Sequence, residues 1–293
     1  MEYETGGTIT EGGEVHGFAV YLITMDKLDQ YWHIMDRGAS IMARLAGFDY
    51  VWDAPPEKSN ELQIQVLNHA VENGADLIML AANDPVQISS AIEDAKSKGI
   101  GIIYVDSPAY EEAIITLATD NYNAGRSAAE IMLGIFSSKG ITGGSIGIIG
   151  VDTVHTTTMD RETGFRNVIG ASGNFLLLPT QYMFGVPDAS QRAAEAIIRD
   201  NEDLVGLFGA NEGATEGVGN AIHQLGSSII GVGFDQTDET VKLIREGSLN
   251  ALMIQNPFTM GFLGMAEAYA ALHGLDTGPN HIDTGISVME TER

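Results

Sequence analysis

Polar and aromatic side chains follow the ends of several short apolar runs in this 293-residue sequence. In an open sheet of parallel strands, ligands bind outside the carboxyl ends of the strands, so residues just after a predicted strand are the first candidates for a site. Five runs are followed by such residues. The candidates are Asp29, Tyr31, Trp32, Asp106, Ser107, Asn211, Asp235 and Gln255.

These residue types suit a small molecule that carries many hydroxyl groups. A carboxylate accepts hydrogen bonds from two neighbouring hydroxyls, whereas Asn and Gln side chains both donate and accept. Hydrogen bonds to charged groups contribute about 1.5–3 kcal/mol each, and an aromatic ring covers the apolar face of a sugar ring. Other roles stay open for single residues: Asp106 and Asp235 could each cap a helix, and Tyr31 and Trp32 could pack in a core.

Motifs of the common cofactor-dependent and metal-dependent enzymes do not occur in the expected places. The segment after the first predicted strand, residues 24–29, has no glycine, so it cannot be the Gly-x-Gly-x-x-Gly turn of a dinucleotide-binding protein. There is no phosphate-binding Gly-x-x-x-x-Gly-Lys-Ser/Thr loop, and the seven histidines contain no His-x-x-x-His pair. We therefore predict a binding protein with no catalytic residue, cofactor or metal.

Charge and composition restrict the partners. Forty acidic and 15 basic residues give a net charge of −25, which disfavours nucleic acid and anionic lipid surfaces because both are bound through Lys and Arg. Cysteine is absent, which fits an exported protein. No apolar run approaches the roughly 20 residues that cross a bilayer. The polar, Gly-rich start of the chain is interpreted as a spacer that remains after removal of a targeting segment, with a ragged cytoplasmic N-terminus as the alternative.

The elements that position the candidates are short apolar strands alternating with amphipathic helices. Strands are expected at residues 18–24, 50–52, 77–81 and 100–105, and again at 146–149, 175–178, 204–208 and 229–232. Helices are expected at residues 62–71, 86–95, 158–169, 190–199, 212–225 and 238–246. The alternation predicts an α/β protein with two similar doubly wound parallel-sheet lobes.

The end of the chain predicts how the lobes are connected. A strand at residues 251–255, a helix at 260–272 and a strand at 285–289 fit a chain that returns to the first lobe and then crosses back, which gives three hinge crossovers. The expected division is a flexible spacer, an N-terminal lobe of two segments and a C-terminal lobe of two segments. These are residues 1–15; residues 16–119 with 256–282; and residues 120–255 with 283–293.

Together, these motifs resemble periplasmic (type I) solute-binding proteins of sugar ABC transporters, of the ribose/galactose-binding type. The likeness extends from about residue 16 to residue 289 and rests on residue order, type and spacing. The matching positions are Tyr31 and Trp32 ahead of Gly38-Ala39, the strand that ends at Asp106, the Ser-Asp-Asn-like Thr119-Asp120-Asn121, Arg161 ahead of Gly164-Phe165, and Asn211, Asp235 and Gln255. The resemblance implies that these residues, Arg161 included, contact the ligand.

Some positions depart from the pattern of that family. Ser107 stands where many members have Arg, and Ala81 stands where some have Asn, with Asn83 close by. No third aromatic residue is found at residues 186–188, ahead of the helix near Ser190. The ligand therefore need not be ribose or galactose. The negative charges of Asp29, Asp106 and Asp235 are balanced mainly by the positive charge of Arg161. Lys27 is expected to offset part of the remaining negative charge.

The resemblance implies a monomer whose lobes close around a monosaccharide and present it to an ABC transporter permease. It further implies a place outside the cytoplasm, in the periplasm or as a cell-surface lipoprotein. A sensing subunit for a chemoreceptor or kinase and a receptor for a furanose like autoinducer-2 stay open as alternatives. A transcription regulator is disfavoured because only about sixteen acidic, Gly-rich residues precede the first strand, where a basic DNA-binding segment would be needed. An enzyme is disfavoured by the missing motifs, although fold alone does not exclude it.

Overall fold

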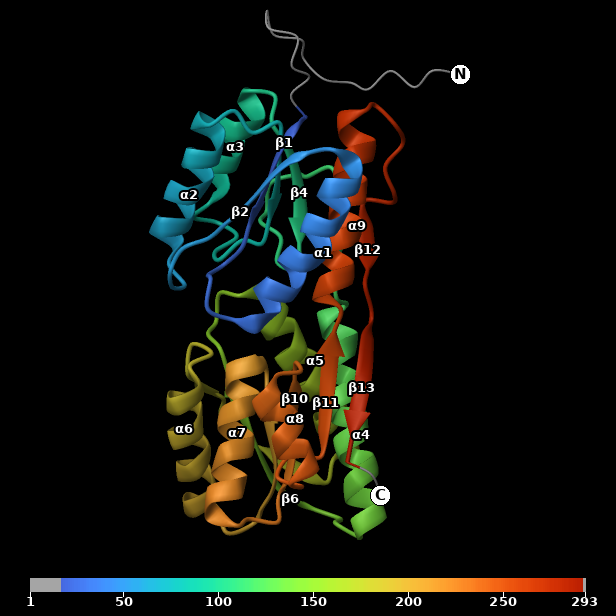
Figure 1. Ribbon diagram of the computed structural model, residues 1–293. Coiled ribbons are helices and arrows are strands. Elements are labelled where there is room, and N and C mark those ends of the chain that lie inside the picture. The colour runs from blue at the N-terminus through green and yellow to red at the C-terminus, as the bar shows by residue number, and fades with distance from the viewer. Residues whose placement is uncertain (1–16, 292–293) are drawn as a thin grey trace, which may run out of the picture. The chain divides into compact units, whose positions relative to one another are not determined.

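The computed structural model describes residues 17–291 and is shown in Figure 1. The predicted spacer, residues 1–15, lies outside the described residues. The described chain divides into two compact units, which we call unit 1 (residues 17–118 and 256–284) and unit 2 (residues 119–255 and 285–291). The chain therefore passes between the units three times, after residues 118, 255 and 284.

Unit 1 is a parallel sheet covered by helices. Its strands are β1 (Ala19–Ile23), β2 (Asp49–Asp53), β3 (Leu77–Leu80), β4 (Gly101–Val105), β5 (Thr116–Ala118) and β12 (His281–Asp283). Its helices are α1 (Gln30–Ala46), α2 (Asn60–Glu72), α3 (Ser89–Ser97) and α9 (Pro257–Leu272). The strand order is β12-β5-β4-β3-β1-β2, with all neighbours parallel. One apolar core lies under α1 and α9 and another under α2 and α3, which is why β3 and β4 are apolar without alternation.

Unit 2 repeats this arrangement. Its strands are β6 (Gly144–Gly150), β7 (Phe175–Leu177), β8 (Gln181–Tyr182), β9 (Leu204–Gly209), β10 (Ile230–Phe234), β11 (Ala251–Gln255) and β13 (Ile286–Glu290). Its helices are α4 (Asn121–Lys139), α5 (Thr156–Ser172), α6 (Pro187–Asp200), α7 (Glu212–Leu225) and α8 (Asp238–Arg245). The strand order is β13-β11-β10-β9-β6-β7, with β13 antiparallel to β11 and β8 paired with β6.

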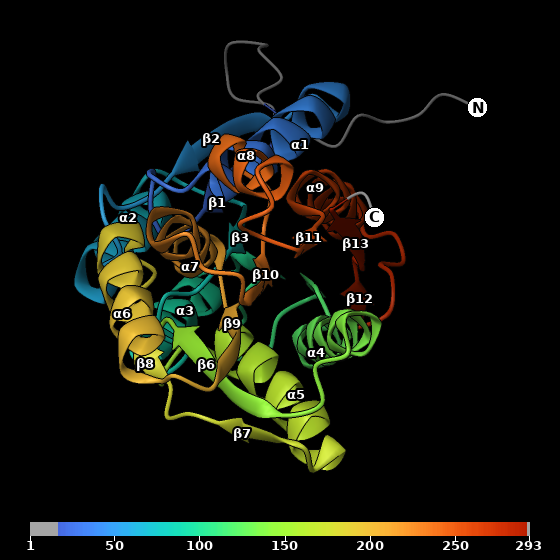
Figure 2. The ribbon, with the colours of Figure 1, turned by 90° about the horizontal axis from the view of Figure 1, so that it is seen from below.

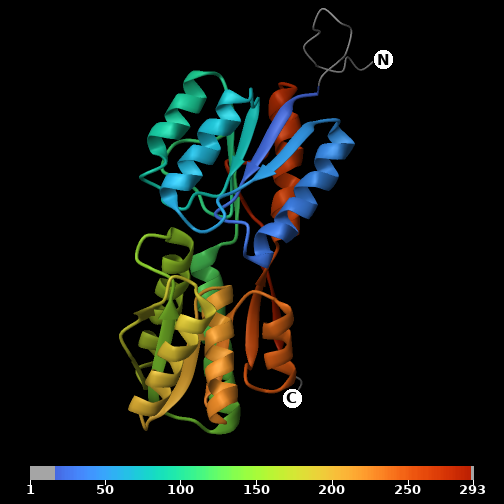
Figure 3. The ribbon, with the colours of Figure 1, turned by 60° about the vertical axis from the view of Figure 1, so that its left-hand side comes forward.

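The two sheets have the same strand order when corresponding strands are compared. In unit 1, β1 lies between β2 and β3, and β4 and β5 follow outward. In unit 2, β6 lies between β7 and β9, and β10 and β11 follow outward. This is the doubly wound order in which the loops that form a ligand site emerge together at the carboxyl ends of adjacent strands. Figure 3 shows the strands of unit 1 with helices on both faces. The predicted fold class is confirmed.

Five elements are not among the ranges expected from the sequence: the helices α1 and α4 and the short strands β5, β8 and β12. Two boundaries also differ from the expected division. Thr284 belongs to unit 1 because its amide donates to the carbonyl of Ala118 and so extends the β5–β12 pairing. Thr119 belongs to unit 2, where its hydroxyl donates to Gln255.

Helices α4 and α5 lie side by side in unit 2, as Figure 2 shows, and glycine allows their close approach. A Cβ atom on Gly125 of α4 would lie 2.0 Å from the carbonyl oxygen of Arg161 on α5. A Cβ atom on Gly164 of α5 would lie 2.0 Å from the carbonyl oxygen of Tyr122 on α4. The two backbones are therefore in contact at the level of Arg161, and this packing fixes the position from which the Arg161 side chain extends.

Candidate functional site

The predicted site residues form two groups, one at the carboxyl ends of the strands in each unit. In unit 1 they follow the adjacent strands β1, β3 and β4, and in unit 2 they follow β6, β9, β10 and β11. The unit 1 group comprises Asp29, Tyr31, Trp32, Asn83, Asp106 and Ser107. The unit 2 group comprises Arg161, Asn211, Asp235 and Gln255.

Asp106 is the buried carboxylate of the unit 1 group. It follows β4 directly and is 6% exposed. The phenol of Tyr31, in the first turn of α1, donates a hydrogen bond to Asp106 Oδ1 over 2.7 Å. The ring of Tyr31 packs edge-on against Trp32, with centroids 4.9 Å apart. The pair of aromatic residues therefore both contributes to the core and orients the carboxylate through the Tyr31 hydroxyl.

Asp29 pairs with a cation from another loop. Lys58 Nζ, in the segment between β2 and α2, lies 2.9 Å from Asp29 Oδ2 and 3.9 Å from Asp26 Oδ2. Asp26 also accepts the amide hydrogens of Leu28 and Asp29, and so shapes the turn into α1. The expectation for Lys27 is wrong: its ammonium lies 2.7 Å from Asp53, so it offsets a different carboxylate. Lys58 and Asp26 are charged residues near Asp29 that spacing alone does not reveal.

Two members of the unit 1 group carry buried polar atoms without a hydrogen-bond partner among the described residues. These atoms are Trp32 Nε1 and Asn83 Oδ1. The Asn83 amide groups are otherwise held, since its backbone N–H donates to Gln63 and its side-chain NH2 donates to the carbonyl of Met25. Ser107 is buried, and its backbone is bonded to Val105 and Ala82. The unit 1 group therefore contains one buried donor, Trp32 Nε1, and one buried acceptor, Asn83 Oδ1, that no described residue satisfies.

The unit 2 group is a connected set of buried polar side chains. Gln255 Nε2 donates to Asp235 Oδ1 over 2.9 Å. Arg161 extends from α5 with its guanidinium carbon 4.2 Å from the centroid of the Phe234 ring, a cation–π contact. Its Nη1 lies 4.0 Å from Asp235 Oδ2 and donates to the carbonyl of Ala210. The structure therefore places the side chains of Arg161, Asp235 and Gln255 next to one another.

Asn211 lies at the start of α7, where its Oδ1 accepts the amide hydrogen of Ala214. The side-chain nitrogen of Asn211 faces Gly185, because a Cβ atom there would lie 2.8 Å from Nδ2. The residue before Gly185 is Phe184, which is 69% exposed and has a φ of +55°. Residues 186–188 contain no aromatic residue, and Phe184 is an exposed aromatic residue two positions earlier, in a backbone conformation that the sequence pattern does not reveal.

Asp106 and Asp235 occupy equivalent places and share an unusual backbone. They directly follow the corresponding strands β4 and β10, each donates its amide hydrogen to the next strand, and each has a left-handed φ, +65° and +69°. Asp tolerates this region better than most residues, at a cost of order 1–3 kcal/mol. Neither carboxylate caps a helix, because α8 is capped by Thr237 and α4 by Asp120. The capping alternative is thereby removed for both residues.

An aspartate–histidine pair lies in the loop between β6 and α5. The carboxylate of Asp152 accepts the backbone amide hydrogens of Val154 and His155 and, over 2.6 Å, the Nδ1 hydrogen of the His155 ring. Burial acts to raise the pKa of Asp152, but these hydrogen bonds outweigh it and hold the pKa at about 2. The other ring nitrogen of His155, Nε2, is buried and has no partner among the described residues.

The lowered pKa makes a prediction for stability. Because the folded pKa of Asp152 lies below its ordinary value of 3.8, the stabilisation is fully present above about pH 5 and is lost between about pH 4 and pH 2. We expect Asp152→Asn to lower the free energy of unfolding at pH 7 by about 1 kcal/mol, after allowance for solvent screening. Urea titrations of both proteins at pH 7, 4 and 2.5 check this. An equal difference at all three pH values would contradict it.

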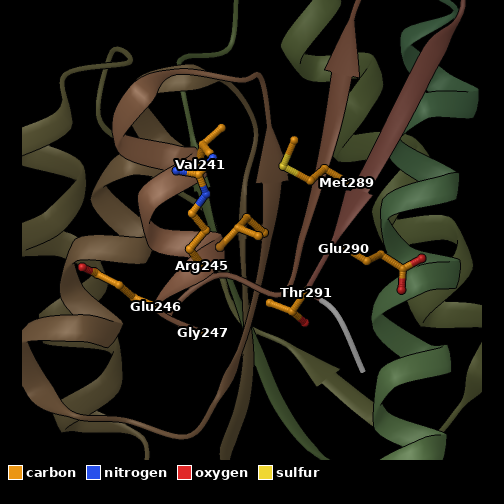
Figure 4. Close-up of a pocket in the computed structure, with 8 residues that line it drawn as sticks. Val241, Arg245, Glu246, Gly247, Met289, Glu290 and Thr291 are labelled. Carbon is orange, nitrogen blue, oxygen red and sulfur yellow. The ribbon is translucent and has the colours of Figure 1, made fainter.

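Among residues 17–291, one serine has the sequence spacing of a reactive centre but not its position in the fold. Residues 143–147 read Gly-Gly-Ser-Ile-Gly, the spacing of a nucleophile elbow, but Ser145 lies inside β6 and donates to Asp203. Figure 4 shows a pocket beside α8 and the end of β13. Its volume is about 530 Å³, and none of the candidate residues lines it. Within residues 17–291, no cluster of three or more metal-binding side chains occurs. No helix in the same range is long and apolar enough to span a bilayer.

Two doubly wound lobes, three chain crossings and polar side chains after corresponding strands define the class of type I solute-binding proteins. Comparison with known proteins gives the family. Residues 20–276 match the family described as periplasmic binding protein domain, and the chain belongs to this family. It is a family of binding proteins, in agreement with the expectation that the chain is not an enzyme.

Relatives and solved structures are similar over most of the chain. The ribose import binding protein of Bacillus subtilis is 24% identical over 74% of this chain and 70% of its own length. The D-allose-binding periplasmic protein of Escherichia coli is 23% identical over 89% of this chain and 88% of its own. A solute-binding protein of an ABC transporter from Agrobacterium vitis, solved with α-D-tagatopyranose, superposes with a TM-score of 0.88 at 26% identity, covering 94% of this chain and 95% of that one.

Proposed function

We propose that this protein captures a small polyhydroxylated ligand, a monosaccharide, and delivers it to the permease of an ABC transporter. Its place is outside the cytoplasm, either free in the periplasm or tethered to the cell surface as a lipoprotein. Support comes from relatives that are named for ribose and D-allose and from a similar structure solved with a tagatose ring. The family and the site chemistry support the same ligand class.

The observation that carries the proposal is the matched pair of carboxylates. Asp106 and Asp235 are buried acceptors in equivalent positions, each oriented by a neighbouring side chain: Tyr31 for the first and Gln255 for the second. A carboxylate can accept two adjacent hydroxyl hydrogens, and adjacent hydroxyls are the defining feature of a sugar. The guanidinium of Arg161 can donate hydrogen bonds to the oxygen atoms of a sugar. Phe184 adds an exposed aromatic side chain that can cover the apolar face of the sugar ring.

The mechanism that we propose is lobe closure. A ligand that is bound by both groups of residues has a higher affinity for the conformation in which both can reach it. Binding then shifts the conformational equilibrium by that difference in affinity. The permease would recognise the liganded conformation, and the three chain crossings would act as the hinge.

A thermal-shift screen tests the ligand class. D-Ribose, D-allose, D-xylose, D-arabinose and D-tagatose, each at about 100 times its Kd, are expected to include at least one sugar that stabilises the folded protein by about 2.7 kcal/mol. We expect the melting temperature to rise by about 5 °C or more. Amino acids and inorganic phosphate serve as controls without effect. A rise with an amino acid and none with any sugar would overturn the proposal, whereas a rise only with an autoinducer-2-like furanose would indicate a signal receptor.

A further inference from the structure

The segment at the first chain crossing, Thr119-Asp120-Asn121, contacts the unit 2 group at two separate points. Thr119 is 4% exposed, and its hydroxyl donates to Gln255 Oε1 over 3.0 Å. Asn121 is also buried, and its Oδ1 accepts the Nε hydrogen of Arg161 over 2.7 Å. Asp120 between them caps α4 by accepting the amide hydrogen of Asn123. Each residue of the segment thus has a specific partner.

We propose that this segment is a positioning element for the ligand site: Thr119 fixes the side-chain amide of Gln255, and Asn121 fixes the guanidinium of Arg161. The inference rests on the proposed function, since it concerns how the same site presents its donors and acceptors. Neither residue need touch the ligand. Their effect would pass through Gln255 and Arg161.

The hydrogen-bond pattern around Gln255 allows one orientation of its amide. Asp235 is a carboxylate and only accepts, so Gln255 must turn Nε2 towards it. Oε1 then faces the Thr119 hydroxyl, which donates. Without the Thr119 hydroxyl, the buried Oε1 of Gln255 would lose its hydrogen-bond donor, which costs free energy. Rotation of the Gln255 side chain away from Asp235 would then become more favourable. Thr119 therefore stabilises the orientation in which Asp235 is held.

Asn121 acts on the cation in the same way. Its side-chain NH2 donates to the backbone carbonyl of Thr119 over 3.0 Å, which leaves Oδ1 pointing to Arg161. Arg161 Nε is bound by Asn121 and Nη1 by the carbonyl of Ala210, so the plane of the guanidinium is fixed. Its remaining N–H groups are left to face Asp235 and a ligand.

Thr119→Val, which keeps the shape of the side chain but removes the hydroxyl, tests the proposal. We expect it to weaken binding of the best sugar from the panel above about tenfold in isothermal titration. Thr119→Ser restores the donor and should bind within about twofold of wild type. Thr284→Val is the matched control at the third crossing, because Thr284 Oγ1 is buried without a hydrogen-bond partner among residues 17–291. It should bind as wild type does.

A second readout does not depend on the ligand. In the unliganded protein, the side-chain NH2 signals of Gln255 in a ¹H–¹⁵N spectrum should shift in Thr119→Val and stay in place in Thr119→Ser and Thr284→Val. If Thr119→Val does not fold, Asn121→Leu replaces it, with the Nε–H signal of Arg161 as the readout. Unshifted signals together with wild-type affinity would overturn the inference. Wild-type protein that binds no sugar would overturn the proposed function instead, and the spectra would still decide whether Thr119 positions Gln255.

Discussion

Asp235→Ala is expected to weaken sugar binding about 100-fold, which corresponds to about 2–3 kcal/mol. The substitution removes a charged acceptor for ligand hydroxyls. It also leaves the Gln255 amide without its acceptor and Arg161 without a nearby carboxylate, in a site where all three side chains are buried. Isothermal titration with the best-binding sugar of the panel measures the loss.

Asp235→Asn is the control for that experiment. It keeps the size of the side chain and one oxygen that can accept from Gln255, so affinity should fall less than in the alanine variant. Far-ultraviolet circular dichroism of both variants should match wild type. Unchanged affinity in Asp235→Ala would remove this residue from the site.

Gly125→Ala is expected to lower the free energy of unfolding by about 3 kcal/mol. The new methyl group would lie 2.0 Å from the carbonyl oxygen of Arg161, and backbone at such a distance has to move. Since Arg161 extends from that part of α5, sugar affinity should fall as well. Urea denaturation and isothermal titration of the variant measure the two effects.

Gly134→Ala is the matched control on the same helix. Nothing lies within 4 Å of a Cβ atom at Gly134, so the higher helix propensity of alanine should raise the free energy of unfolding by up to about 1 kcal/mol. Sugar affinity should not change. A loss of stability in this variant similar to that of Gly125→Ala would show that close helix contact is not the cause.

The sequence predicted the repeated α/β order because the long strands are continuous apolar runs that end in polar residues. It did not reveal β5 and β12, since three-residue strands such as Thr116–Ala118 carry no pattern and form only when chain segments distant in sequence pair. It also did not reveal α4, whose many small residues, Gly125 among them, suit close packing against α5 and show little amphipathic pattern.

In the candidate site, too, the sequence indicated some residues and not others. Residues that directly follow strands, such as Asp106 and Asp235, could be identified because their place depends on local order. Lys58 could not, because it reaches Asp29 from a loop 29 residues away. Phe184 could not, because its exposure depends on a left-handed backbone at that residue. Contacts between loops and unusual backbone angles require coordinates.

The left-handed backbone at Asp106 and Asp235 limits how the specificity of the protein can change during evolution. Glycine would relieve the conformational cost there and give a more stable chain, but one without an acceptor. Most other side chains would add strain. Asparagine alone combines tolerance of this conformation with a polar group of the same length. New ligand preferences are therefore more accessible through neighbours such as Ser107 or Lys58 than through the two carboxylates.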